Sequence, residues 1–320
     1  MKKIILGRTN HSVSKISLGT WSFGGSNKTG NISVGWSNQN KSDSKSALIK
    51  AWEKEINHWD TADVYGDGLC ESIIGDTWKI VPRDNIFLAT KVGWDKGAYS
   101  HWYHPEQILK NTERSLKNLK TDYIDLIYLH HCNFGKNDEY FDSALEILQD
   151  FKASGKTRFI GLSDWSCKKI MKFVNRCNPD VVQPLRNLMD DSYEESGLKA
   201  HVEKHNLGVC FFSPLKHGLL TGKYRKVPKF QDGDHRSQIS EFRNIELIKK
   251  MRENKKRLES RFSNIDNPVL HGLINSLLID SKTGCVLLGQ RNEEQVNIAA
   301  SIKSSISSED ADWVKSIYQN

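Results

Sequence analysis

Short apolar runs alternate with amphipathic segments along most of the chain. The runs that predict strands are residues 16–21, 56–62, 86–91, 123–129, 158–163, 181–188, 209–213 and 286–289. The segments with apolar residues at helical spacing are 45–55, 71–79, 105–119, 144–153, 167–174, 198–205 and 294–302. Near-continuous apolar strands that alternate with helices predict a parallel sheet covered by helices. Because eight strands close a (β/α)8 (TIM) barrel, we expect this α/β fold.

Additional elements are expected at both ends of the barrel sequence. Apolar residues 4–6 and 13–16 bracket a polar turn, and this pattern predicts an N-terminal β-hairpin. Residues 245–262 and 309–318 predict extra C-terminal helices. Since α/β barrels often exceed about 250 residues, we expect a single domain over residues 1–320.

The composition and net charge of the chain indicate which kinds of molecule it can bind. Hydrophobic residues make up 38% of the 320 residues and charged residues 27%, and the formal net charge is +7. These values permit a large core and suit a phosphate-bearing ligand. The densest basic run, residues 249–261, is interrupted by Glu253 and Glu259 and lacks interleaved aromatic residues. It therefore predicts a solvated helix face, and we expect a small-molecule partner and no nucleic acid.

The cysteines and the apolar runs favour a cytoplasmic location. Six cysteines are scattered without a C-x-x-C pair, which indicates neither a zinc site nor a redox dithiol. His130, His131 and Cys132 also predict no metal site, because adjacent strand residues point to opposite faces. No apolar stretch is long enough to cross a bilayer, and residues 4–6 are too short for a signal peptide. We expect a reducing compartment and no membrane partner.

Four polar side chains stand at the ends of three consecutive predicted strands. Asp60 and Tyr65 follow the second strand, Lys91 ends the third, and His130 ends the fourth. Because the strands of such a barrel run parallel, these ends converge on its C-terminal rim, where catalytic residues lie in this fold. Each residue alone has a plain alternative, as a helix cap, a surface residue or a core residue. Their combination at one rim favours a site.

These residue types suit proton transfer to a carbonyl oxygen. A free tyrosine has a pKa of about 10, and a buried ammonium beside it stabilises the phenolate and lowers that pKa. Asp60 would keep Lys91 charged, and His130 can hydrogen-bond a substrate oxygen. Tyr65 would then donate a proton to the carbonyl oxygen while hydride reaches the carbon.

Several segments closely resemble signatures of the aldo-keto reductase superfamily. They are residues 6–9 with 19–21, 60–66, 89–91, 122–130, 155–163, 212–215 and 218–224. The matches run in order from the N-terminus to about Val296, and the pattern looks most like the bacterial general-stress-type members. The resemblance implies a (β/α)8 barrel that binds NADPH, or alternatively NADH, in an extended form without a Rossmann motif.

The resemblance also implies residue roles. Tyr65 would be the general acid and base, and Lys91 would tune it. Asp60 would hold Lys91, and His130 would orient the carbonyl. Ser163 and Gln183 would meet the nicotinamide carboxamide and Phe212 would stack on its ring. The residues expected along the pyrophosphate are Ser213, Leu215, Gly218 and Lys223, and those near the adenosine 2′-phosphate are Gln290, Arg291 and Gln295. Further expected cofactor contacts are Gly19, Thr20, Trp21, Asp60, Asp164, Pro214 and Gly289.

Some positions depart from the family pattern. Asp164 stands where the family usually has Asn, and we hypothesise that its negative charge favours the oxidised, positively charged nicotinamide. Arg186 replaces a usual Tyr, and Leu288 replaces a usual Pro. Ile298 and Ala299 replace the pair that grips adenine, which leaves the choice between NADP and NAD open.

Two functions of different classes are consistent with the sequence. The leading hypothesis is an NADPH-dependent oxidoreductase that reduces an aldehyde or ketone to an alcohol, or runs the reverse reaction. The alternative is a cofactor-binding regulatory or scaffold subunit, as potassium-channel β-subunits of this superfamily are. A third reading is a phosphate-substrate barrel without nicotinamide. Sugars and aromatic carbonyls both suit a pocket lined by Trp21, Trp94, Trp102 and Trp165 and bounded by residues 27–39, 94–103 and 216–243.

Overall fold

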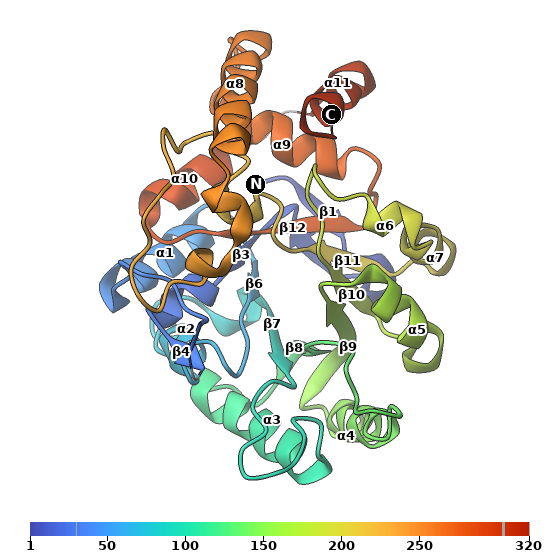
Figure 1. Ribbon diagram of the computed structural model, residues 1–320. Coiled ribbons are helices and arrows are strands. Elements are labelled where there is room, and N and C mark those ends of the chain that lie inside the picture. The colour runs from blue at the N-terminus through green and yellow to red at the C-terminus, as the bar shows by residue number, and fades with distance from the viewer. Residues whose placement is uncertain (30, 303–304, 320) are drawn as a thin grey trace.

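Eight parallel strands close into a barrel (Figure 1). The computed structural model describes residues 1–29, 31–302 and 305–319, so residue 30 of the predicted polar loop lies outside the described part. The strands are β3 (Ile16–Gly19), β6 (His58–Asp60), β7 (Phe87–Val92), β8 (Ile124–Leu129), β9 (Thr157–Asp164), β10 (Val181–Pro184), β11 (Gly208–Phe211) and β12 (Gly284–Gly289). They neighbour one another in chain order, and β12 pairs with β3 to close the ring. The predicted (β/α)8 barrel is confirmed.

Helices surround the barrel on its outer side (Figure 1). They are α1 (Lys41–Glu53), α2 (Leu69–Gly75), α3 (Pro105–Leu119), α4 (Phe141–Ala153), α5 (Cys167–Cys177), α6 (Ser192–Glu195), α7 (Leu198–His205), α8 (Ile245–Arg261), α9 (Pro268–Leu278), α10 (Glu293–Ser301) and α11 (Ser308–Gln319). In α3, Pro105 occupies the first turn, where its missing N–H costs nothing, and Lys120 ends the helix with a φ of 50°. None of the described helices combines the length and apolar character needed to span a bilayer.

The predicted hairpin closes the N-terminal end of the barrel. β1 (Lys3–Ile5) pairs antiparallel with β2 (Ser12–Ser14). Leu6, which follows β1, and Val13, in the middle of β2, are fully buried among residues of the barrel interior. Arg8 between the strands donates from Nη2 to Asn178 O at 2.5 Å and to Pro179 O at 2.6 Å. These bonds hold the hairpin across the end of the barrel opposite the rim.

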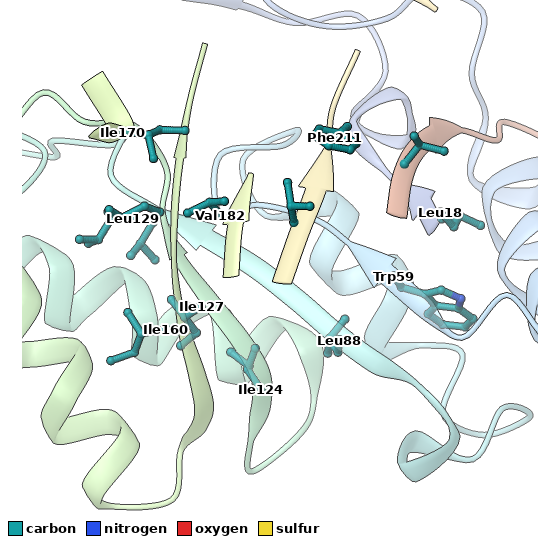
Figure 2. Packing of buried hydrophobic residues seen from close by; sticks show 14 of the residues in the cluster. Leu18, Trp59, Leu88, Ile124, Ile127, Leu129, Ile160, Ile170, Val182 and Phe211 are labelled. Carbon is teal, nitrogen blue, oxygen red and sulfur yellow. The ribbon is translucent and has the colours of Figure 1, made fainter. Parts of the chain in front are cut away.

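The core forms two layers because strand side chains alternate between two faces. One cluster combines outward-facing strand residues with the apolar faces of the helices, and Figure 2 shows Leu18, Trp59 and Leu88 within it. A separate cluster fills the barrel interior and includes Tyr128 and Cys210. The alternation therefore directs the neighbours of Trp59, including Asp60, into the barrel.

The structure differs from the predicted elements in several places and at several element boundaries. The sequence pattern left residues 263–285 without a predicted helix, but α9 lies there, beginning at Pro268. The predicted strand at 181–188, in which a break at Pro184 was expected, ends at that residue, because proline cannot donate to the ladder. The polar loop after β3 contains a small hairpin of β4 (Lys28–Thr29) and β5 (Ile32–Ser33).

Candidate active site

The four rim residues predicted from the strand ends lie together. Asp60 ends β6, Lys91 is near the end of β7, and His130 directly follows β8. Lys91 Nζ donates to Asp60 Oδ1 at 2.5 Å and to Thr61 O at 2.8 Å, and it lies 3.5 Å from Tyr65 Oη. The His130 ring packs edge-on against Tyr65 with centroids 5.9 Å apart. The four side chains therefore form one cluster at the C-terminal mouth of the barrel.

The Asp60–Lys91 ion pair is buried and needs further hydrogen bonds. The two side chains are 3% and 2% exposed. A buried ion pair is stable only where its remaining donors and acceptors are satisfied. Gln183, which was predicted to meet a carboxamide, supplies one such bond, because its Nε2 donates to Asp60 Oδ2 at 2.9 Å. Gln183 thus positions the carboxylate that holds Lys91.

Tyr65 is carried on the turn after β6, and two glycines let this turn approach its neighbour. Gly66 has a φ of 59°, and a Cβ there would lie 2.7 Å from the Gly24 Cα. The Tyr65 ring stacks on Trp21 at 6.0 Å with an interplanar angle of 25°. The close approach of the two backbones therefore sets the position of the phenol.

Burial and neighbouring charges set the protonation of the cluster. Burial raises the pKa of Tyr65 to about 12 against the opposing effect of Lys91. We expected Lys91 to lower this pKa, but desolvation of the phenolate outweighs the ammonium. Burial lowers the pKa of Lys91, but Asp60 and Tyr65 more than offset it and the net shift is upward. Burial, together with Lys91, lowers the pKa of His130 well below its ordinary value. At neutral pH Tyr65 is protonated, Lys91 charged and His130 uncharged.

The residues predicted at the nicotinamide end are hydrogen-bonded within the chain. Ser163 Oγ donates to Gln183 O at 3.1 Å. Asp164 accepts at its two carboxylate oxygens from Cys132 N and Ser166 N, each at 2.7 Å. The Asp164 carboxylate therefore orients the loops that follow β8 and β9.

The segment predicted along the pyrophosphate is a tightly folded loop. Ser213, Lys216 and His217 have φ values of 57°, 46° and 55°, and Gly218 has a φ of 88°. Left-handed backbone costs free energy at non-glycine residues and clusters at functional sites. Lys223 reaches back to this loop, because a Cβ on Gly218 would lie 3.1 Å from Lys223 Nζ.

Arg291, predicted near the 2′-phosphate, holds the polar loop that follows β3. Its Nη2 donates to Ser37 O and Asn38 O, each at 2.5 Å, and its Nε donates to Gln39 Oε1 at 2.8 Å. Gln295 accepts at Oε1 from Arg291 N at 3.0 Å. Arg291 and Gln295 therefore lie together, as expected, but the guanidinium of Arg291 is already hydrogen-bonded to residues 37–39.

The remaining predicted cofactor residues occupy the ends of β3, β11 and β12 or the loops beyond them. They are Gly19, Thr20, Trp21, Phe212, Pro214, Leu215 and Gly289. Gln290 is different, since it is 1% exposed and its Nε2 donates to Ser17 O at 3.1 Å. Its side-chain amide nitrogen is therefore already hydrogen-bonded to the backbone of β3.

Arg186 lies behind the sheet. Its Nη1 donates to Leu277 O at 3.0 Å, and its guanidinium packs on the Tyr193 and Phe211 rings at 4.8 Å from each centroid. Arg186, which stands where the family usually has Tyr, therefore takes part in the packing between β11 and the outer helices.

Comparisons with known proteins agree with the barrel fold. Residues 15–319 match the Aldo/keto reductase family. The chain belongs to that family. It is 27% identical over 327 residues to "Aldo-keto reductase YhdN" of Bacillus subtilis (strain 168), covering 100% of this chain and 94% of the relative. It is 28% identical over 255 residues to a "Probable voltage-gated potassium channel subunit beta" of Arabidopsis thaliana, covering 75% of this chain and 71% of the relative.

A solved structure gives the same fold. The glycerol dehydrogenase AKR11B4 from Gluconobacter oxydans superposes with a TM-score of 0.80 at 25% identity, covering 98% of this chain and 94% of that one. The aldo/keto reductase family consists of oxidoreductases that act on carbonyl groups and use a nicotinamide cofactor. These findings place the present barrel among such oxidoreductases.

One wall of this aldo/keto reductase site combines predicted and unpredicted aromatic residues. Trp21 lies 5.6 Å from Trp36 and 4.9 Å from His235, and His217 lies 5.4 Å from His235, measured between ring centroids. Trp21 was expected at the site from the sequence, whereas Trp36, His217 and His235 were not, because their loops carry no periodic pattern.

A second aromatic group at the site contains only residues that were expected from the sequence. The Trp94 ring lies 5.6 Å from Trp102 and 5.8 Å from Trp165, and Trp165 lies 6.0 Å from Phe212. These four aromatic residues were all predicted near the site, and the structure brings them together.

Asp234 joins two loops over the mouth and was also missed. Its Oδ2 accepts from Ser37 N at 3.0 Å and Ser37 Oγ at 2.7 Å, and its Oδ1 accepts from Arg236 Nε at 2.9 Å. Gly233 O accepts from Gly35 N at 3.0 Å. An acidic residue beside a basic one in a glycine-containing loop was the only available sequence signal.

Proposed function

We propose that this protein is an NADPH-dependent carbonyl reductase in which Tyr65 exchanges the proton. The observation that carries the proposal is the 3.5 Å separation of Lys91 Nζ from Tyr65 Oη, within a pair that Asp60 completes. In the oxidising direction the same tyrosine would accept the proton of an alcohol, by microscopic reversibility.

Lys91 stabilises the product of proton donation. Tyr65 enters the reaction protonated because burial keeps the pKa of its phenol high. As negative charge develops on the substrate oxygen, the proton moves from Tyr65 Oη to that oxygen and the O–H bond of the phenol breaks. The resulting phenolate lies beside the Lys91 ammonium, which Asp60 keeps charged. The ion pair therefore acts on the phenolate that forms during the reaction.

His130 orients the oxygen that accepts the proton. Its neutral imidazole carries one N–H, and this group can donate to a carbonyl oxygen placed against Tyr65. Among the described residues, its Nδ1 has no hydrogen-bond partner. A neutral donor holds the ground-state carbonyl without offering a competing acid.

The residues present fit a phosphorylated nicotinamide cofactor. Burial, followed by the charges of Arg236 and Arg291, lowers the pKa of Lys223. Arg236 is paired with Asp234 at 2.6 Å, whereas Lys223 has no carboxylate partner among the described residues, so its ammonium can meet an anion such as a dinucleotide phosphate. Phe212 would face the nicotinamide, and Arg291 would meet the 2′-phosphate through Nη1, since its bonds to the 37–39 loop use Nε and Nη2. When bound, reduced NADPH supplies hydride to the carbonyl carbon.

Replacing Tyr65 by phenylalanine tests the assignment. We expect Tyr65→Phe to lower turnover of aldehydes and ketones by about 10²–10⁴-fold, because the proton donor is lost. NADPH binding, followed by the change in its fluorescence, should be retained. Tyr123→Phe is the matched control, since Tyr123 directly precedes β8, at the end of the barrel opposite the rim, and its hydroxyl donates to Asp84 Oδ1 at 2.7 Å. Undiminished turnover in Tyr65→Phe would contradict the assignment.

A second candidate is a cofactor-binding regulatory or scaffold subunit. It is favoured by the similarity to a probable potassium channel subunit beta. An intact Asp60, Tyr65, Lys91 and His130 cluster argues for the enzyme. NADPH binding without oxidation by any member of an aldehyde and ketone panel would establish the subunit instead.

We also propose a cytoplasmic protein built as one domain over residues 1–320. All six cysteines are free and buried, which suits a reducing compartment. Thiol titration of protein isolated under nonreducing conditions checks this proposal.

A further inference from the structure

A second group of chemically reactive side chains lies inside the barrel. One ring nitrogen of His58 and the sulfurs of Cys210 and Cys285 lie within 4.8 Å of one another. They come from β6, β11 and β12, and all three residues are fully buried. Cys210 and Cys285 are register partners on neighbouring strands. This group, which we call the His58–Cys210–Cys285 cluster, plays no part in the proton transfer proposed above.

The cluster lies beneath the rim. His58 and Asp60 are two residues apart on β6, so they face the same side of the strand and are separated by about 6.8 Å along it. Asp60 points into the barrel mouth, and His58 therefore points into the interior one layer below. The position is enclosed by the hairpin at one end and by the Asp60–Lys91 pair at the other.

The spacing of the ligand atoms matches a metal centre. The distance from His58 Nδ1 to Cys285 Sγ is 3.6 Å. With metal–sulfur bonds of about 2.3 Å and metal–nitrogen bonds of about 2.05 Å, tetrahedral geometry separates the two ligand atoms by about 3.6 Å. Two thiolates and an imidazole are a donor set that selects zinc or copper(I) over magnesium or calcium.

The histidine faces the cluster through Nδ1. Its other ring nitrogen, Nε2, is buried and has no hydrogen-bond partner among the described residues, so no hydrogen bond there fixes the tautomer. Its Nδ1 lies 2.8 Å from Ser17 Oγ, and this hydroxyl is placed to supply a fourth, oxygen ligand. Besides its contact with His58, Cys285 Sγ lies 3.8 Å from Val209 O and within hydrogen-bonding reach of Cys210 and Ser17. Two thiolates, a neutral imidazole and a divalent cation sum to zero charge, which reduces the cost of burial.

We propose that His58, Cys210 and Cys285 bind one thiophilic metal ion, Zn²⁺ in the first instance, as a structural centre inside the barrel. The ion would tie β6 to β11 and β12 across β3, which supplies Ser17. The cysteine spacing in the sequence indicated no zinc site, because the three ligands come from strands far apart in the chain and no local motif links them.

Metal content and spectroscopy of the purified protein test the proposal. The full chain is expressed in medium supplemented with Zn²⁺ or Co²⁺ and dialysed against EDTA, and its metal content is measured by mass spectrometry. A fully buried ion exchanges slowly, so we expect about one equivalent per chain to remain. The cobalt form should show a thiolate-to-metal charge-transfer band, which reports sulfur ligands directly.

Two variants and a matched control complete the design. Cys285→Ala should reduce the retained metal to about a tenth of the wild-type level or less and abolish the charge-transfer band. His58→Gln should do the same while leaving both thiols in place. Cys177→Ala is the control, because Cys177 is a buried cysteine at the end of α5 and should keep the metal. Circular dichroism verifies that each variant is folded.

Three results would overturn the proposal. The first is wild-type protein without retained metal or a charge-transfer band after expression in both supplemented media. The second is equal metal retention in folded Cys285→Ala, which would place the ion elsewhere. The third is a disulfide between Cys210 and Cys285, identified by mass mapping of peptides from protein isolated under nonreducing conditions, because oxidised sulfurs could not coordinate the ion. None of these results bears on the role of Tyr65.

Discussion

At the scale of single residues, opposing electrostatic effects determine which groups at the rim carry protons. Tyr65 keeps its proton because desolvation of the phenolate outweighs the attraction of Lys91. Lys91 keeps its charge because Asp60 and Tyr65 outweigh burial. The histidines facing the mouth lose their charge because no carboxylate offsets their burial to the same extent. The site can therefore donate a proton from the phenol oxygen of Tyr65, and the histidine side chains around it are uncharged.

The buried His217 side chain predicts a measurable pH dependence of the unfolding free energy. Burial, followed by His235, lowers the pKa of His217 from 6.5 to about 3. Below pH 6.5 the unfolded chain binds a proton that the folded protein does not, so stability falls as the pH falls toward 3. His217→Asn, which suits the left-handed backbone at this position, should reduce the loss of unfolding free energy between pH 7 and pH 5 by about 2 kcal/mol. Urea unfolding of the wild type and of His217→Asn at pH 7 and pH 5 measures this loss of unfolding free energy. An equal loss in the two proteins would contradict the role of His217.

At the scale of elements, loops rather than strands carry the residues that complete the site. Strand ends place Asp60 and Lys91 because the parallel ladder leaves little freedom. The turn bearing Tyr65 depends on the close contact between the backbones of Gly66 and Gly24. The loops that cover the barrel mouth are joined by the hydrogen bonds of Asp234. Each of these contacts has a substitution that disturbs it selectively.

Gly66→Ala should move the catalytic phenol. The new Cβ would lie 2.7 Å from the Gly24 Cα on a backbone with a φ of 59°, so the turn must shift. We expect a loss of about 2–4 kcal/mol in unfolding free energy and at least about a 10-fold loss of turnover. Gly155→Ala is the control, because Gly155 also has a positive φ of 76° but meets nothing within 4 Å. It should cost about 1 kcal/mol and leave turnover intact. Equal effects of the two substitutions would remove the packing explanation.

Asp234→Asn should loosen the cover of the mouth. Asp234 is fully buried and accepts hydrogen bonds from Ser37 and Arg236, so its neutral analogue weakens both charge-assisted bonds. We expect cleavage of the 231–239 loop by a broad-specificity protease to accelerate about 10-fold. In the same loop, Asp232 pairs with Lys28 but is 80% exposed, so Asp232→Asn should change little. Equal cleavage rates for the two variants would refute the joining role of Asp234.

At the scale of the whole molecule, the two ends of the barrel have separate tasks. The C-terminal mouth gathers the charged and aromatic residues, and the N-terminal end is closed by the hairpin. In this fold, residues at the N-terminal end contribute to stability and residues at the C-terminal end to chemistry. The additional helices α8, α9 and α11 pack on one side around their own apolar cluster (Figure 1).

Arg8→Ala should separate stability from catalysis. Arg8 donates to two carbonyl groups about 170 residues away in the chain, so its loss leaves the hairpin less firmly held. We expect a loss of about 1–2 kcal/mol in unfolding free energy with turnover unchanged. Lys3→Ala, at an exposed position of β1, is the control for removing a charge. A fall in turnover together with stability would contradict the separation.

The sequence by itself determined the barrel, the order of its strands and the rim position of Asp60, Lys91 and His130. It could do so because buried parallel strands produce apolar runs and the end of each run marks the rim. It also placed Tyr65 on the loop after the second strand, because the phenol follows the strand end closely in the chain, and the resemblance to a family implied the same residue.

Only the tertiary structure decided which side chains meet across the mouth and in the interior. Gln183 contacts Asp60, Arg291 is engaged by the 37–39 loop, and Asp234 joins two loops far apart in the chain. The three ligands of the interior cluster likewise come from separate strands. These contacts depend on how the strands stagger and how irregular loops fold, and neither leaves a periodic trace in the residues. Burial follows from the same packing, which is why the high pKa of Tyr65 could not be read from its neighbours alone.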